Sequence, residues 1–225
     1  MSSILKQPNI RKAIVLALGA VCIQPAVIIA DTDGPVASSN IATIEQVGSY
    51  HQATIVQAGY GNIAQIRQAP FGSNDLLNQG TERGIAQIEQ NGSQHYAEIN
   101  DYGNNNEIAV HQWQVEHYAE VNLQGNNNTI DVQQAGMEQS FISLISGNGN
   151  EIYSTQLGGF HSSYVAIDGN QNEVDLLQMG ESNLSSVQIQ GNKNTVSIMQ
   201  SGNELGFILE FSGNNEDVYI SQNGF

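Results

Sequence analysis

Hydrophobic and polar residues alternate along this chain in a pattern that restarts, block after block, from Asn40 to Phe225. Within each block of 11, positions 1 to 7 have a period of two, which predicts a β-strand. Position 9 is glycine in 14 of 17 blocks, which predicts a bend with positive φ or a close backbone approach. A fixed, short repeat of strand and turn is typical of a solenoid.

Positions 3, 5 and 7 of the block are expected to face inward. Position 5 is aliphatic in 15 of 17 blocks, the exceptions being Ser143 and Ser154. Acidic residues avoid these three positions apart from Asp75 and Asp101. The core residues predicted with most weight are Ile44, Ile55, Ile66, Ile88, Ile99, Val132, Ile198 and Ile220.

Odd-numbered and even-numbered blocks differ, so the true repeat is a pair of blocks. Position 7 is glutamine in all nine odd blocks, and position 1 is asparagine in seven of them. We therefore predict an all-β fold, a β-solenoid of 22-residue strand–turn–strand coils in which two parallel sheets stack in a cross-β-like manner. Eight and a half coils at a spacing of roughly 4.8 Å would give a rod roughly 40 Å long.

Stacking places equivalent side chains over one another, so buried amides can hydrogen-bond to their own copies. An unpaired buried polar group would otherwise cost roughly 1–3 kcal/mol. The predicted glutamine ladder is Gln46, Gln68, Gln90, Gln112, Gln134, Gln156, Gln178, Gln200 and Gln222. The predicted asparagine ladder is Asn40, Asn62, Asn106, Asn128, Asn150, Asn172 and Asn194.

The ends of the repeat array carry no obvious polar cap. The last full block has Phe207, Leu209 and Phe211 at its inward positions, and the sequence ends one block later. Unpaired strand edges are templates for another chain. An array that is open at both ends is suited to adding more copies of itself.

The N-terminal segment, residues 1–30, follows a different pattern. Three basic residues precede an apolar run, residues 13–30, which ends in a small residue, Ala30. This pattern predicts a secretory signal peptide over residues 1–30. A membrane-anchoring helix is the alternative, but Pro25 and the absence of a charged stop argue against it.

Charge and cysteine content exclude several classes of function for the mature chain. The single cysteine, Cys22, lies in the leader, so no disulfide or thiolate metal site is expected. Beyond the leader, three basic and 22 acidic residues give a net charge of −19. Such a chain repels nucleic acid and anionic lipid. Because no nucleophile elbow, phosphate loop or metal quartet is present, we expect no enzyme and no cofactor.

The pattern N-x-A-x-I-x-Q-x-G-x-x-[NH]-x-A-x-I-x-Q, over Asn40 to Gln57 and in part over Gly84 to Gln90, resembles the curlin repeat of bacterial curli. Curli are the functional amyloid of biofilm matrices. The resemblance covers about 186 of 225 residues. It implies a secreted subunit that self-assembles into extracellular, pilus-like adhesive fibres, with the glutamine and asparagine columns as the amyloid-forming positions. It also implies three kinds of partner: another curlin subunit, an outer-membrane secretion pore and accessory factors.

Within that family the subunit type stays open. We divide the chain into the leader, a short linker or targeting segment at 31–39, and a repeat domain of 17 half-repeats at 40–225. The linker is shorter than the family's usual pore-targeting segment. An alanine-rich first half resembles the minor, nucleating subunit, whereas strong acidity and the lack of a basic C-terminal repeat favour the major one. A monomeric β-solenoid adhesin is the alternative from another class.

Four of the five histidines, His51, His95, His117 and His161, lie at position 1 of even blocks. His95 and His117 are one full repeat apart and should stack within about 5 Å. They are candidates for a pH or metal switch on assembly. The interpretation that we favour is that histidine replaces asparagine at a corner, because other polar residues fill the same column.

Outward-facing acids could form a calcium surface, but solvated charges that oppose edge-to-edge pairing are the commoner arrangement. They include Glu45, Glu89, Glu98, Glu107, Glu120, Asp131, Glu173 and Asp175.

Residues 69–83 break the pattern. Pro70 replaces the corner glycine, Asp75 lies at an inward position, and Thr81 replaces the next glycine. Since proline cannot donate a ladder hydrogen bond, we expect a bulge here that slows assembly, with a partner-binding site as the alternative.

Overall fold

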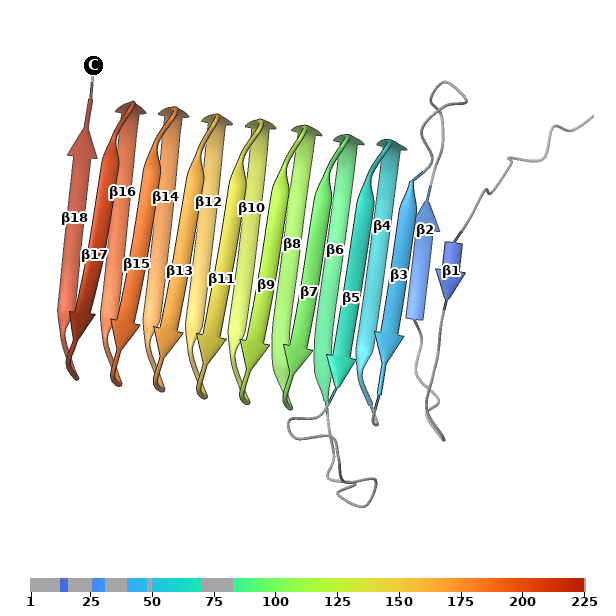
Figure 1. Ribbon diagram of the computed structural model, residues 1–225, viewed down its shortest axis with the longest axis horizontal. Coiled ribbons are helices and arrows are strands. Elements are labelled where there is room, and N and C mark those ends of the chain that lie inside the picture. The colour runs from blue at the N-terminus through green and yellow to red at the C-terminus, as the bar shows by residue number, and fades with distance from the viewer. Residues whose placement is uncertain (1–12, 16–25, 31–39, 48–49, 70–82, 225) are drawn as a thin grey trace, which may run out of the picture.

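The computed structural model describes residues 13–15, 26–30, 40–47, 50–69 and 83–224 of the chain. Over these residues the chain winds into a stack of coils. Two parallel sheets face each other, and short turns along both sides join them (Figure 1). The predicted β-solenoid is confirmed.

Each sheet contains nine strands, and every strand pair within it is parallel. The first sheet comprises β1 (Ala13–Val15), β3 (Ile41–Gln46), β5 (Ile63–Ala69), β7 (Tyr96–Tyr102), β9 (Tyr118–Gln124), β11 (Ser140–Ser146), β13 (Ser162–Asp168), β15 (Leu184–Gln190) and β17 (Gly206–Ser212). The second sheet comprises β2 (Ala26–Ala30), β4 (Gln52–Tyr60), β6 (Gly84–Ser93), β8 (Asn106–Val115), β10 (Thr129–Met137), β12 (Glu151–Gly159), β14 (Glu173–Glu181), β16 (Thr195–Asn203) and β18 (Asp217–Asn223).

Consecutive strands alternate between the sheets, so one strand of each sheet makes a coil. Equivalent residues of successive coils lie side by side: Gln134 pairs with Gln156 and Gly136 with Gly158. The strands from β3 to β18 make eight coils. This is half a coil fewer than the count of blocks predicts.

The interior is lined by positions 3, 5 and 7, as predicted. Alternation along a strand sends every second side chain to the same face, and the two inner faces meet in a dry core. The predicted position-5 residues ahead of the last coil are at most 2 % exposed: Ile44, Ile55, Ile66, Ile88, Ile99, Val132 and Ile198. Ile220 packs on the same core but is only partly buried, because it lies in the final coil.

The two serines that interrupt the aliphatic column occur beside the largest buried side chain. Phe141 is fully buried, and Ser143 and Ser154 are at most 1 % exposed. Ser143 lies on the same inward face of β11 as Phe141, two residues along the strand. Small residues in the core leave room for the phenylalanine ring at normal packing density.

The regular 22-residue spacing changes once. Strand β6 pairs with β4, and β7 pairs with β5, so that Gln57 is next to Gln90 and Ile63 is next to Tyr96. The sequence separation of such partners is 33 here, against 22 for the other strand pairs from β3 onward. One block has therefore been left out of the stack. The predicted bulge falls on residues 70–82, which lie outside the described residues. The prediction of one constant spacing along the whole stack is wrong at this point.

The corner glycines show both predicted properties. Gly136 has φ of +128°, and a Cβ atom there would lie 1.7 Å from the carbonyl oxygen of Gly158 in the next coil. Any side chain would therefore push two coils apart. A second left-handed position, position 11, was not foreseen, because residues as different as Tyr50 (φ 63°) and Phe160 (φ 58°) occupy it.

The apolar leader contributes strands. Strand β1 pairs with β3 and β2 pairs with β4, each parallel, at the N-terminal end of the stack (Figure 1). Among the described residues, no helix is long and apolar enough to cross a membrane. The signal peptide stays a prediction.

Replacing Gly136 by alanine is expected to lower the free energy of unfolding by roughly 3 kcal/mol or more, because the new Cβ overlaps the Gly158 carbonyl. Urea unfolding of the soluble monomer, followed by circular dichroism, measures this. Gly206→Ala is the control, since a Cβ there meets nothing within 4 Å. Equal unfolding midpoints for the two variants would contradict the close-approach argument.

Candidate functional site: the side-chain ladders and the ends of the stack

A ladder of glutamine amides runs along the inside of the second sheet. Each Nε2 donates to the Oε1 of the glutamine in the following coil, over 2.8 to 2.9 Å. Its members are Gln57, Gln90, Gln112, Gln134, Gln156, Gln178, Gln200 and Gln222. All seven bonds point the same way, so the ladder has a direction.

Each ladder amide also bridges the two sheets. The Nε2 of Gln134 donates to the carbonyl of Tyr118 at 3.1 Å, and that of Gln112 donates to the carbonyl of Tyr96 at 3.0 Å. Both side chains are fully buried. Because water cannot reach them, their donors and acceptors depend wholly on these partners.

The predicted single glutamine column is divided between the sheets. Gln46 donates to Gln68 at 2.9 Å in the first sheet, and the next residue of that column is Asp101. Gln57, which was not among the predicted ladder residues, takes their place in the second sheet. The cause is the omitted block, which moves all later odd blocks from the first sheet to the second.

The asparagine column is divided in the same way. Asn40 and Asn62 lie in the first sheet, whereas the later predicted members lie in the second: Asn106, Asn128, Asn150, Asn172 and Asn194. At these corners the Oδ1 accepts a backbone N–H from the next coil, as Asn128 does from Asn150 at 2.8 Å. The Nδ2 donates to a glycine carbonyl, as Asn150 does to Gly169 at 3.0 Å. Each asparagine thus ties its corner to the neighbouring coil.

Histidine reproduces these asparagine contacts in the first sheet. The Nδ1 of His95 accepts the N–H of His117 at 3.3 Å, and the Nε2 of His117 lies 2.7 Å from the carbonyl of Trp113. The rings of His95 and His117 stack at 5.0 Å, as predicted. An imidazole with its hydrogen on Nε2 fits both contacts. His51, however, lies in the second sheet's column, so the four histidines do not form one column.

Burial disfavours the charged form of these histidines. Desolvation and, secondarily, repulsion by His117 lower the pKa of His95 to about 4. Desolvation also lowers the pKa of His117 and of His161. Among the described residues no group of three metal-ligating side chains occurs.

An exposed asparagine ladder was missed from the sequence. It follows the turns at position 10, where each backbone N–H donates to the Oδ1 of the next asparagine over 2.7 to 2.9 Å. Its members are Asn104, Asn126, Asn148, Asn170, Asn192 and Asn214. The signal was present as a G-N-x-N tetrapeptide that recurs every 22 residues from Gly103 to Asn194.

A buried polar cluster marks the change of register. Asp101 is fully buried, and it accepts hydrogen bonds from Asn106 at 2.6 Å and from Gln68 at 3.5 Å. Burial raises the pKa of its carboxyl to about 6. A Cβ on Gly84 would lie 2.9 Å from Asp101 Oδ2, Gln68 Nε2 and His51 Nδ1, so a larger residue there would have to displace these side chains. Beyond Asp101 this column becomes apolar, from Leu123 to Phe211.

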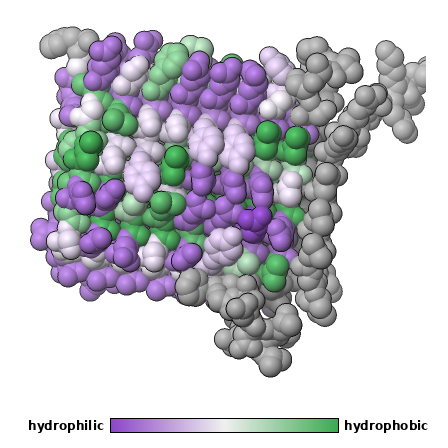
Figure 2. Space-filling model, viewed as in Figure 1, coloured by the Kyte–Doolittle hydropathy of each residue, from purple (hydrophilic) through white to green (hydrophobic). Residues whose placement is uncertain are grey.

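The outer surface is mixed in character. On the face turned to the viewer in Figure 2, hydrophobic side chains occur in patches among hydrophilic ones. Several predicted outward acids are held by neighbours: Glu98 accepts from Tyr96 at 2.5 Å, and Glu120 accepts from Tyr118 at 2.6 Å. Glu45 pairs with Arg67 at 3.0 Å, an exposed contact that contributes little to stability.

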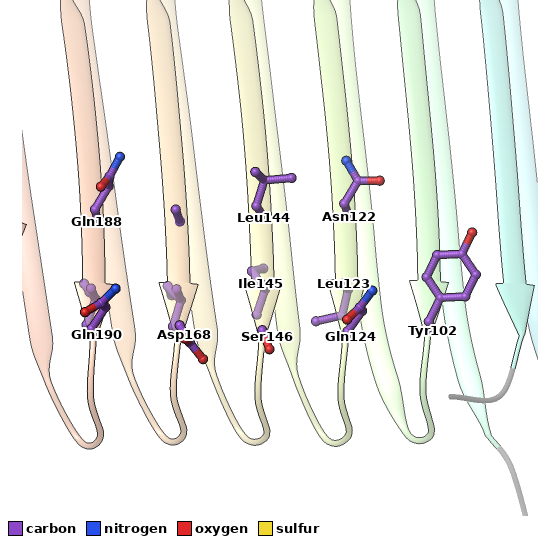
Figure 3. A pocket seen from close by; sticks show the side chains of 13 residues that line it. Tyr102, Asn122, Leu123, Gln124, Leu144, Ile145, Ser146, Asp168, Gln188 and Gln190 are labelled. Carbon is purple, nitrogen blue, oxygen red and sulfur yellow. The ribbon is translucent and has the colours of Figure 1, made fainter. Parts of the chain in front are cut away.

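A shallow groove of about 560 Å³ crosses the ends of β7, β9, β11, β13 and β15 (Figure 3). Amide, small and aliphatic side chains line it, including Asn122, Leu144, Ser146 and Gln188, and Asp168 is its only charged side chain. This lining offers no paired acid and base for catalysis.

The two ends of the stack differ chemically. At the N-terminal end, Gln57 Oε1 is buried and accepts no hydrogen bond from any described residue. At the C-terminal end, Gln222 Nε2 donates to the carbonyl of Gly206 at 3.2 Å and to no other described residue. In the last described coil, five apolar residues pack on the core but are only partly buried: Phe207, Leu209, Phe211, Val218 and Ile220.

This arrangement of coils, corners and ladders agrees with a match to a known family model. The model, described as the curlin associated repeat, matches residues 38–69, 86–112 and 169–202. This chain carries curlin repeats. The first match ends before the omitted block, and the second begins after it. Residues 113–168 are not matched, but the curlin-type ladders continue through them without a break. No curated protein matches the chain.

The curlin repeat family is a family of structural fibre subunits rather than of enzymes, and its proteins form extracellular fibres. The β-solenoid described above fits a subunit of this kind.

Gln134→Ala is expected to lower the free energy of unfolding by about 2–4 kcal/mol, because it leaves Gln112 Nε2 and Gln156 Oε1 buried without their partner. Gln133→Ala, on the outer face of the same strand, is the control and should change stability by less than about 0.5 kcal/mol. Urea midpoints of the two soluble variants decide the matter; similar losses would argue against the ladder.

Asp101→Asn is expected to raise the free energy of unfolding at pH 7 by on the order of 2 kcal/mol. The folded-state pKa of Asp101 lies above its ordinary value of 3.8, so the wild-type protein loses stability as pH rises from 3.8 through 6. The variant's advantage should therefore vanish below pH 4. Asp168→Asn, at an exposed carboxyl, is the control. A pH-independent difference would refute the assignment.

Proposed function

We propose that this protein is a secreted structural subunit that polymerises end to end into an extracellular, curli-like amyloid fibre for biofilm matrix and adhesion. The second-sheet glutamine ladder and the corner asparagines carry the stacking, and the position-5 aliphatics supply its dry core. The leader over residues 1–30 directs export, and an outer-membrane pore with accessory factors releases the chain. We assign it the major-subunit role, with a minor curlin subunit as partner.

The observation that carries this proposal is the pair of unmatched ladder ends. Gln57 Oε1 is a buried acceptor without a donor among the described residues, and Gln222 Nε2 is the last donor of the ladder, in β18, where it bonds to a backbone carbonyl and to no further glutamine among the described residues. The ladder always runs from Nε2 of one coil to Oε1 of the next. Gln222 of one copy can therefore donate to Gln57 of another without any change of direction.

The apolar columns of the two ends are complementary as well. If β17 stacks on β3 and β18 on β4 of a second copy, Phe207 meets Ala42 and Val218 meets Ala53, in the register found elsewhere. A large side chain then lies over a small one. The partly exposed last coil would be buried, with a gain of about 25 cal/mol for each Å² of apolar surface removed from water.

The acidity of the chain supports the major-subunit role. With a mature net charge of −19, free subunits repel one another, which opposes unguided association and favours growth on a preformed end. A nucleating subunit would need to start fibres without such an end. The alternative from another class, a monomeric adhesin, would leave the last coil exposed permanently.

The chain beginning at Asp31 is expected to form thioflavin T-positive fibres after a lag that its own seeds shorten. Gln222→Ala should slow seeded growth about tenfold, equivalent to about 1.4 kcal/mol, because the joint loses one buried hydrogen bond. Asn223→Ala, whose side chain is exposed, is the control. Growth without a lag would favour the nucleator, and a β-rich protein that stays monomeric at high concentration would favour the adhesin.

A further inference from the structure

The leader and a second copy of the protein would use the same edge of the stack. Strand β2 pairs in parallel with β4 over its whole length, and β1 pairs in parallel with β3. These are the two strands against which an incoming copy would lay β18 and β17. The full-length chain therefore has its N-terminal edge occupied by its own leader.

The leader strand carries the repeat's own pattern. Ala26 lies opposite Ala53, and Ile28 lies opposite Ile55, so position 3 is alanine and position 5 is isoleucine in both strands. The match ends at position 7, where Ala30 lies opposite Gln57. Alanine has no amide, which is why Gln57 Oε1 receives no hydrogen bond from the described residues. The leader thus satisfies the backbone of the edge but not its ladder.

We propose that the leader is a removable edge cap, which keeps the uncleaved chain from being extended at its β3/β4 end. This inference rests on end-to-end growth and adds a condition to it. Strand β2 ends at Ala30, the residue after which the signal peptide is expected to be cut. One cleavage therefore removes β1 and β2 together and exposes the edge.

The cap gives the uncleaved chain a specific behaviour. Its C-terminal edge, formed by β17 and β18, stays open, so it can join a growing fibre once through that edge. Having joined, it presents a capped edge to the next subunit. Uncleaved chains should consequently fail to polymerise alone and should terminate growth at one end of a mature fibre.

The test follows both ends of single fibres. Seeds of the chain beginning at Asp31 carry one fluorophore, and mature monomer carrying a second fluorophore extends them under total internal reflection microscopy. A substoichiometric amount of full-length chain is then added. Growth is expected to stop at one end of each seed and to continue at the other. Continued growth at both ends would overturn the cap.

The matched control is the full-length chain with Ile14→Pro, Val15→Pro, Val27→Pro and Ile28→Pro. Along a strand, successive N–H groups point to opposite sides, so two adjacent prolines always remove one donor on the side that pairs. The leader keeps its length and its apolar character. This variant should leave both ends growing. If it blocks growth as well as the unmodified leader does, the effect is non-specific adsorption of an apolar tail and the proposal is wrong.

Hydrogen exchange gives a second measurement on the soluble monomer. Backbone amides of β3 and β4 should exchange more slowly in the full-length chain than in the cleaved chain or in the proline variant. Equal exchange in all three would overturn the cap even if full-length material were too poorly soluble for the fibre assay. Failure of the mature chain to grow from its own seeds is a separate result, which contradicts end-to-end growth and not the leader's pairing.

Discussion

Each buried glutamine of the second-sheet ladder hydrogen-bonds to the glutamine one coil away. Gln134 lies where water cannot reach it, between identical side chains above and below. This dependence fixes the register of the strands, since a slip by one residue would turn the amide outward and leave its neighbours unpaired. It also gives the stack a direction, with an acceptor, Gln57 Oε1, at one end of the ladder and a donor, Gln222 Nε2, at the other.

Much of this could be read from the sequence, because the solenoid repeats one environment. The period of two and the corner glycines predicted the coil, the inward-facing positions and the spacing of the His95 and His117 rings. The omitted block could not be read, because the 11-residue period runs through it without a break. Pro70 and Asp75 indicated where the pattern is disturbed, but not that the register of the strands would change there. The left-handed backbone at position 11 could not be predicted either, since the tight turn imposes it on whatever residue is present.

Two buried titratable groups oppose each other in their effect on stability. Between about pH 4 and 6, Asp101 holds a proton in the folded state more readily than it does when unfolded, whereas His95 holds one less readily. Acid therefore stabilises the coil at one site and destabilises it at the other. The contributions of these two groups therefore partly cancel, while the lowered pKa values of His117 and His161 add to the destabilisation by acid.

The omitted block has a mechanical consequence for any fibre built from this chain. It leaves Gln46 at the inner edge of the first sheet, where a joint would place Phe211 of the preceding copy opposite its amide. At every joint, therefore, only one of the two sheets continues its column without interruption. Under tension a fibre should break there before it breaks within a subunit. Each fragment would then consist of whole subunits, and both of its fresh ends would be able to grow again.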